Sequence, residues 1–362
     1  MTKQLKTRQI CFFLIAFLPV TKIFTLPSIL AENSAEDMWI SALFSLIFDF
    51  LTLLAVVFTC RKTNMSFFEL LEYNLGKTGK NIVLVLYFIC FTIKAYLPIV
   101  EQKEYVELTL YTLTPATFYF LPFFFAGFYL CLKNLRVLGR ASDVAFLITL
   151  IGFLILFALS IANADFSAIL PIGASGFNKI IGGSFKSLTW FGDSAYLLFF
   201  IGNFKYEKKS GVKILISFII SAIIVLGFML TFYAIFTSIA HRQRFALTEI
   251  SKYTTVINNL GRFDYLGIIC ILFSSVISLS LPIYFCTHIL NHIFKLKKVY
   301  IAPLITVGAQ FLAIIFLSKY MASVQKFITE YGGFLFFTMS NVIPILIALF
   351  CKKEKKYEVQ QG

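Results

Sequence analysis

Four charged side chains lie inside long apolar stretches of this chain: Lys22, Asp49, Lys94 and Asp193. A charge at the bilayer centre costs about 2.5–3.5 kcal/mol on insertion scales, so such residues face the bundle interior and pair there, or mark binding sites. A buried carboxylate can receive an ammonium group, and a buried lysine can receive a carboxylate. These residues therefore predict either structural ion bridges or a site for a small charged molecule.

Lys22 lies in residues 10–31, a stretch long enough to cross a membrane, with Pro19 and Pro27 on either side of it. Proline removes a backbone hydrogen bond and clashes with the preceding turn. In lipid, such a break persists where protein or a water-filled cavity satisfies the freed groups. We expect a half-helix over about 10–18, an unwound section over about 19–22, and a second half-helix. The alternative is a proline kink with a snorkelling lysine.

A second break is expected in residues 187–195, where Gly192, Asp193 and Ser194 interrupt an apolar run. Glycine permits the backbone to unwind at little steric cost. Secondary transporters build substrate sites near the midplane from broken spans of this kind.

The composition is that of a polytopic membrane protein. Hydrophobic residues make up 59% of the 362 residues and charged residues only 14%, whereas soluble domains carry about 25% charged residues. Apolar windows of about 20 residues predict ten spans. They cover 10–31, 38–60, 81–106, 116–132, 142–162, 186–204, 212–237, 263–290, 299–318 and 333–351.

The net charge of +14 follows from the connections between these spans. About two thirds of the 32 lysine and arginine residues lie in one alternate set, which includes both termini. The positive-inside rule therefore predicts that both termini are cytoplasmic, and it accounts for the basic balance without nucleic acid. The N-terminus also resembles a signal peptide, but Lys22 interrupts its apolar core, so we expect no cleavage.

Ten spans suggest a single transmembrane domain over residues 1–362, with two halves of five spans. Repeat one covers about 10–162, repeat two about 186–351, and residues 352–362 form a cytoplasmic tail. An odd number of spans per half makes the second half enter the membrane from the opposite side, which is an inverted repeat. The fold class is therefore all-α, with spans one and six broken.

The two breaks lead us to pair Lys22 with Asp193, between spans one and six. The second half of span one offers free N–H donors and a positive dipole end to a carboxylate, while Asp193 and unwound carbonyls could receive an ammonium. This describes a pocket for a zwitterion such as an amino acid. We pair Asp49 with Lys94 as a structural ion pair between spans two and three. The alternative is that both pairs merely hold helices together.

The candidate binding residues come from three spans. They are Val20, Thr21 and Lys22 in the first break, Trp190, Phe191, Gly192 and Asp193 in the second, and Ser274, Ser275 and Ser278 in span eight. Lys94, Glu101 and Glu104 on span three suggest a path for water or ions. The seven cysteines occur singly, so we expect neither disulfides nor a metal site. We find no enzyme motif, and we expect no catalytic residue and no cofactor.

Four stretches of the chain resemble the spore-germination permease family, the B subunit of nutrient germinant receptors. They are Thr25-Leu26-Pro27 with Trp39-Ile40, Phe68-Glu69-Leu70-Leu71 with Leu75-Gly76-Lys77, Phe191-Gly192-Asp193, and Arg262-Phe263-Asp264 with the Leu290–Leu296 end. Their order and spacing extend over nearly the whole chain. Val20, Thr21 and Lys22 stand where the family usually has glycines, so this site has less room and carries a fixed charge.

The resemblance implies a fold similar to amino acid–polyamine–organocation transporters, with a leucine-transporter-like inverted repeat. It implies a subunit in the spore inner membrane that senses a small nutrient, often an amino acid, and triggers germination together with an A-type membrane subunit and a C-type lipoprotein. Two alternatives remain open. One is a cation- or proton-coupled amino acid transporter without receptor partners, and the other is a structural subunit whose site the Lys22–Asp193 pair closes.

Overall fold

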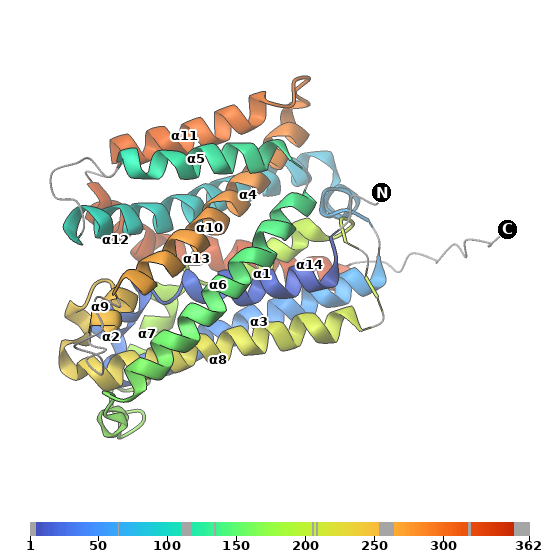
Figure 1. The fold of residues 1–362 in the computed structure, drawn as a ribbon. Helices are drawn as coiled ribbons and strands as arrows, with labels where there is room; N and C mark the ends of the chain where they lie inside the picture. Colours follow the sequence, from blue (N-terminus) through green and yellow to red (C-terminus); the bar gives the residue numbers. More distant parts are fainter. Residues whose placement is uncertain are drawn as a thin grey trace.

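The computed structural model is a helical bundle in which most long helices run along roughly one direction, while α6 and α10 cross them at an angle (Figure 1). It describes residues 5–63, 65–109, 117–133, 135–204, 206–207, 209–252, 264–317 and 320–350. The first half of the chain contributes α1 (Thr7–Val20), α2 (Leu26–Ser34), α3 (Met38–Lys62), α4 (Phe67–Thr109), α5 (Thr117–Leu132) and α6 (Leu135–Ile161).

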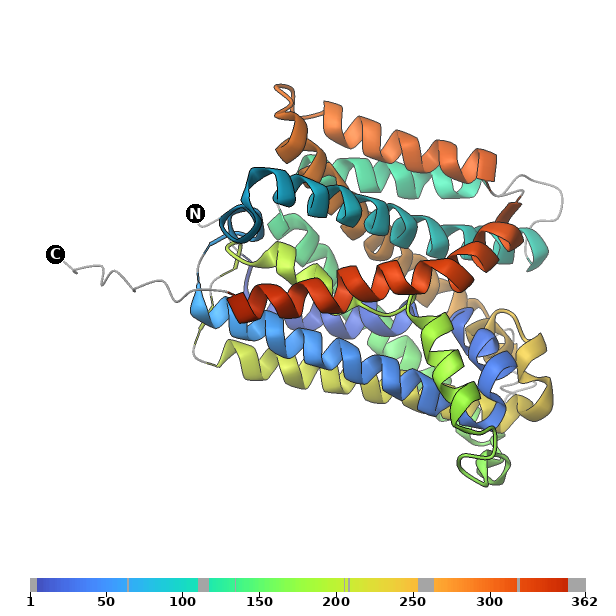
Figure 2. The ribbon, with the colours of Figure 1, turned by 180° about the vertical axis from the view of Figure 1, so that it is seen from behind.

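The second half has similar elements with more interruptions. It contributes α7 (Phe177–Ser187), the 3-10 helix η3 (Asp193–Phe200), α8 (Ser210–Phe236), α9 (Ala246–Lys252), α10 (Asp264–Phe294) and α11 (Ile301–Leu317). The last span consists of α12 (Met321–Phe327), α13 (Gly333–Phe337) and α14 (Ile343–Phe350), joined by π-helical turns at Ile328–Gly332 and Thr338–Val342. Figure 2 shows this last span running beside α3.

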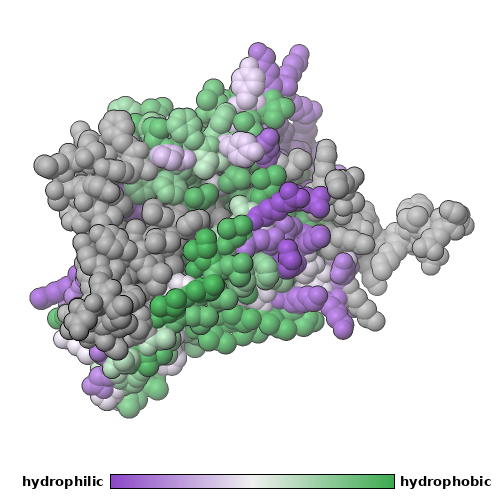
Figure 3. All heavy atoms as spheres, in the orientation of Figure 1, coloured by the Kyte–Doolittle hydropathy of each residue, from purple (hydrophilic) through white to green (hydrophobic). Residues whose placement is uncertain are grey.

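Membrane-crossing segments are clear by length and composition. Five helical segments among the described residues have an apolar window long enough to cross a bilayer, and α1, α11 and part of α5 are shorter apolar helices. The N-terminus and the end of α14 lie at the same end of the bundle, which we call the terminal end; the opposite end is the far end (Figure 1). Hydrophilic side chains gather at the terminal end on the face shown in Figure 3.

Both expected breaks are present. In the first span, α1 ends at Val20 and α2 begins at Leu26. In the sixth, α7 ends at Ser187 and η3 begins at Asp193, after Gly192 with a φ of 83°. The unwound section of span one therefore lies slightly later than predicted, because Pro19 is still accommodated inside α1.

Span six begins earlier than the sequence suggested. Residues 177–187 form α7, whereas the span predicted from the sequence begins at residue 186. Small residues explain the helix, because they let it pack closely on α2 and α3. Ser41 donates to the carbonyl of Ile180 (2.8 Å), Ser184 donates to the carbonyl of Ser41 (2.8 Å), and Gly183 lies against Ser34 and Ser41 with no room for a β-carbon.

Two further helical segments lie outside the predicted spans. The α4 helix starts with a separate leg over residues 67–75, because Gly76 has non-helical angles (φ 68°, ψ 179°). Phe67, Leu70 and Leu71 of this leg are buried, while Leu75 is exposed. The α9 helix is described over Ala246–Lys252.

Candidate functional site

The two helix breaks meet at the carboxylate of Asp193. Lys22 donates to Asp193 Oδ2, and Lys94 donates to Asp193 Oδ1 at 2.9 Å. Lys22 is fully buried, Asp193 is 2% exposed, and the Lys94 side chain is 8% exposed. The structure thus joins Lys22 and Asp193, as the sequence suggested, and adds a second lysine to the same carboxylate.

Each lysine also donates to a backbone carbonyl at a break. Lys22 donates to the carbonyl of Leu18 at 3.3 Å, and Lys94 donates to the carbonyl of Phe191 at 2.6 Å. The end of a helix leaves carbonyls without an intrahelical partner, and a buried polar group without a partner is costly. The two lysines therefore stabilise the unwound backbone as well as the carboxylate.

Asp49 corrects one prediction, because Lys94 pairs with Asp193 rather than with Asp49. Asp49 is fully buried on α3, and its Oδ1 accepts a hydrogen bond from the backbone N–H of Gly192 at 2.7 Å. Its Oδ2 has no hydrogen-bond partner among the described residues. Lys94 pairs with Asp193 because its long side chain extends to the second break, where the carboxylate of Asp193 and the carbonyl of Phe191 lie together.

The remaining predicted residues of the first two groups lie at the breaks. Val20, Trp190 and Phe191 are buried, and Thr21 Oγ1 lies 3.4 Å from Asp193 Oδ2, to which it donates. The ring of Phe191 lies 5.2 Å from the Lys22 ammonium, within the range of a cation–π contact. In span eight, Ser278 is buried on α10, while the side chains of Ser274 and Ser275 lie outside the described part of the structure.

Some buried polar atoms around the second break lack partners. Within the described part of the chain, the hydroxyl oxygens of Thr189 and Ser194, the phenol oxygen of Tyr96 and Asp49 Oδ2 are buried without a hydrogen-bond partner. More than nine in ten buried polar groups in proteins have a partner, so each exception calls for an explanation. A polar ligand or ordered water would satisfy such groups.

A thick aromatic layer separates the ion cluster from the terminal end. Tyr196, one turn beyond Asp193, stacks on Phe91 (5.1 Å between centroids) and on Phe285 (5.9 Å). Phe199 then packs between Phe285 (4.8 Å) and Phe67 (4.6 Å) of the short α4 leg. These rings close that side of the cluster with several apolar layers.

On the far side, the described residues provide two contacts that close the cluster. Glu104 of α4 pairs with Arg244 at 2.6 Å, and both side chains are partly exposed (26% and 43%). Phe245 packs on Phe24 at the first break (5.2 Å between centroids). Glu101 is buried beside Thr25 and Trp190, between this closure and the ion cluster.

Residues of the last span at this site were missed by sequence reasoning. Ser340 lies against Gly192, and Asn341 Oδ1 accepts a hydrogen bond from Thr52 at 2.7 Å. The carbonyl of Met339 accepts from the Tyr87 hydroxyl at 2.7 Å. The run Thr338-Met339-Ser340-Asn341 in an otherwise apolar span was the available signal, because buried amides require partners.

The family model for "Spore germination protein" matches residues 4–326 of this chain. The chain belongs to this family of spore germination proteins. No curated protein matches it. Membership places this spore germination protein among integral membrane permeases, as its apolar helices also indicate.

Solved structures show the fold of this family member. A mutant of the manganese transporter of Eremococcus coleocola is similar with a TM-score of 0.63 and 11% identity, covering 94% of this chain and 76% of that one. MhsT in complex with L-phenylalanine is similar with a TM-score of 0.63 and 10% identity, covering 95% and 97%. The all-α, leucine-transporter-like class with inverted repeats and broken spans is thereby confirmed.

The family and the similar structures are those of permeases and transporters. Among the described residues, no group of three or more His, Cys, Asp or Glu side chains could hold a metal ion. The charges and hydrogen-bonding groups at the helix breaks suit recognition of a polar or charged molecule.

Proposed function

We propose that this chain is the permease-like membrane subunit of a spore germinant receptor and that a small nutrient binds where the two helix breaks meet. The observation that carries the proposal is the set of four buried charges at the breaks: Lys22, Lys94, Asp49 and Asp193. With both carboxylates ionised, their formal charges sum to zero.

This balance favours a ligand without net charge. An uncompensated charge in a buried site costs several kcal/mol, so a zwitterion can exchange partners with the cluster where a simple ion cannot. The ligand carboxylate would replace Asp193 on one lysine, and the ligand ammonium would join Asp193 or the unpartnered Oδ2 of Asp49. An amino acid fits this description, and the similar fold of MhsT is described with L-phenylalanine bound.

The two closures support entry of the nutrient from the far end. Among the described residues, opening that end requires separating the partly exposed Glu104–Arg244 pair and the Phe24–Phe245 contact, whereas the terminal end is closed by several buried aromatic layers. We propose that the terminal end, which carries both termini and the basic connections, is cytoplasmic. The chain would then sit in the spore inner membrane, with Glu101 and Glu104 along the entry path.

The receptor role includes two partners, an A-type membrane subunit and a C-type lipoprotein. Binding at the breaks would alter the tilt of the half-helices, and the partner subunits would respond to this conformational change. Family membership supports this assignment.

The test is nutrient-triggered germination of spores whose own copy is replaced by Lys22→Ala, Asp193→Asn or the double variant, with protein levels checked by immunoblot. We expect each single variant to keep a detectable level but to shift or lose the amino acid response. The control is Arg8→Ala with Asp143→Asn, which removes an ion pair near the terminal end whose side chains are 64% and 22% exposed. If the double variant restores both protein level and response, the pair is a structural bridge and the proposal is wrong.

A second candidate function is amino acid transport coupled to a cation or a proton, because the similar solved structures include transporters. Lys22 would then occupy the place of a coupling cation. Saturable amino acid uptake by the purified chain alone, in vesicles, would support transport. Binding without uptake would support sensing.

A further inference from the structure

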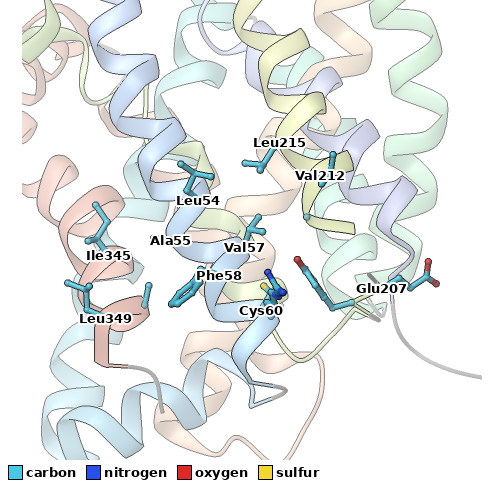
Figure 4. A pocket seen from close by; sticks show the side chains of 14 residues that line it. Leu54, Ala55, Val57, Phe58, Cys60, Glu207, Val212, Leu215, Ile345 and Leu349 are labelled. Carbon is cyan, nitrogen blue, oxygen red and sulfur yellow. The ribbon is translucent and has the colours of Figure 1, made fainter. Parts of the chain in front are cut away.

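A large groove opens on the side of the bundle near the terminal end, away from the helix breaks. Its volume is about 1010 Å³, and it is formed by the last turns of α3, the start of α8, the end of α14 and residues 206–207 (Figure 4). Part of its lining remains exposed: Leu54, Val212 and Leu349 are 38%, 59% and 70% exposed.

One face of α3 forms the floor of the groove. Leu54, Val57, Phe58 and Arg61 recur at helical spacing, so they follow one stripe that is apolar inside the membrane and ends in a positive charge. Leu215 of α8 and Ile345 of α14 stand on either side of this stripe (Figure 4). The groove therefore changes from apolar to basic along the bundle axis.

The basic end offers several groups to an anion. Arg61 is exposed in the last turn of α3, and Lys62 lies over the ring of Phe58 at 4.4 Å. Gly211, in the first turn of α8, also lines the groove, and its backbone N–H donates to the hydroxyl of Tyr206 in the same lining. The first turn of a helix also carries a partial positive charge. The side chain of Glu207 points away from the apolar walls (Figure 4).

We propose that this groove holds a phospholipid with an anionic headgroup. Its acyl chains would lie along the stripe from Leu54 to Phe58, and its phosphate would contact Arg61. A soluble anion would leave the apolar walls uncovered. A transmembrane helix, about 30 Å long and at least 10 Å across, occupies roughly twice the groove's volume or more. Flexible acyl chains suit a groove that covers only the last turns of α3.

Bound lipid would connect α8 with two elements that also hold the second helix break. The α3 helix carries Asp49, whose carboxylate holds the backbone of Gly192, and α14 follows the π-helical turn that presses Ser340 on Gly192. A lipid that bridges α3, α8 and α14 stabilises this arrangement from outside the bundle.

The test compares lipid binding to the full chain in detergent by native mass spectrometry and by the midpoint of thermal unfolding. Dioleoyl phosphatidylglycerol and dioleoyl phosphatidylcholine are the two probes. We expect tighter binding and a larger rise of the midpoint with phosphatidylglycerol. Arg61→Gln should lower its affinity about tenfold, as for loss of a hydrogen bond to a charged group, and Arg61→Lys should lower it less.

Val212→Trp should fill the groove and remove the lipid adduct. The matched controls are Lys77→Gln, an exposed lysine that does not line the groove, and Val144→Trp, at a valine that is 58% exposed on α6. Both control variants should still bind phosphatidylglycerol and show the larger rise of the unfolding midpoint. All variants should unfold cooperatively without lipid. Equal responses to the two lipids, or a response that survives both Arg61→Gln and Val212→Trp, would overturn the proposal. So would a Val212→Trp variant that binds lipid normally but no longer copurifies with a partner membrane subunit.

Discussion

Gly192 in the sixth span lies directly against the side chain of Ser340 in the tenth, which leaves no space for a β-carbon at position 192. The same glycine has a φ of 83°, and its N–H donates to Asp49. One residue thus fixes the second break against both α3 and the last span. This contact therefore positions the second break, just as the ion cluster beside it does.

Replacing Gly192 should destabilise the protein strongly. In Gly192→Ala, the left-handed backbone costs about 1 kcal/mol, and overpacking against Ser340 adds about 1–3 kcal/mol. Ser340→Gly in the same chain should relieve only the second part. The measurement is the midpoint of thermal unfolding in detergent. The control is Gly182→Ala on α7, where nothing lies within 4 Å of the new carbon, and a midpoint for Gly192→Ala equal to the control's would contradict the prediction.

Two substitutions separate the role of Asp49 as a hydrogen-bond acceptor from its role as a buried charge. Asp49→Asn retains an oxygen that can accept from the N–H of Gly192 and loses only the charge, so its midpoint should fall less than that of Asp49→Leu. Asp49→Leu leaves that N–H buried without a partner, which costs about 1–3 kcal/mol. Thermal unfolding and expression level measure both variants. Equal losses in the two would show that the charge, and not the acceptor, is what the fold requires.

The pairing of Lys94 can be tested by two double-mutant cycles. One combines Lys94→Met with Asp193→Asn, and the other combines it with Asp49→Asn. Residues in direct contact show coupling of about 0.5–3 kcal/mol, so we expect the larger coupling with Asp193, to which Lys94 donates at 2.9 Å. Unfolding free energies of the single and double variants provide the measurement. A larger coupling with Asp49 would restore the pairing suggested by the sequence.

The stability of the first turn of the short α4 leg should depend on pH. Ser66 donates to Glu69 from its hydroxyl and from its backbone N–H, both at 2.7 Å, and these bonds lower the pKa of Glu69. A carboxylate with a lowered pKa contributes stability that is present above its unfolded pKa and is lost as the pH falls through its folded pKa. Hydrogen exchange of residues 67–71 should therefore accelerate in acid, relative to the intrinsic rates.

Two variants check this capping interaction. Glu69→Gln should remove the acid dependence, and Ser66→Ala should destabilise the helix start by about 0.5–2 kcal/mol. If protection of these amides falls equally in the native chain and in Glu69→Gln, another group is responsible for the pH dependence.

The membrane class, the spans and both breaks could be predicted because they depend on local features. A proline, a glycine or a charge interrupts an apolar helix wherever that helix lies, and an odd number of spans per half inverts the repeat. The meeting of Lys22 with Asp193 followed from that symmetry, which brings spans one and six together. Its role in nutrient binding remains a prediction.

Which of the four charged residues pair with one another could be learned only from the three-dimensional packing of the helices. The sequence gives the depth of Lys94 and Asp49 along their spans, but the partner of a long side chain depends on how each helix is rotated about its axis. That rotation comes from the packing of many apolar side chains, and it turns Asp49 toward the N–H of Gly192 and Lys94 toward Asp193. The closeness of Ser340 to Gly192 has the same origin, because no local pattern specifies which surface of the tenth span contacts the sixth.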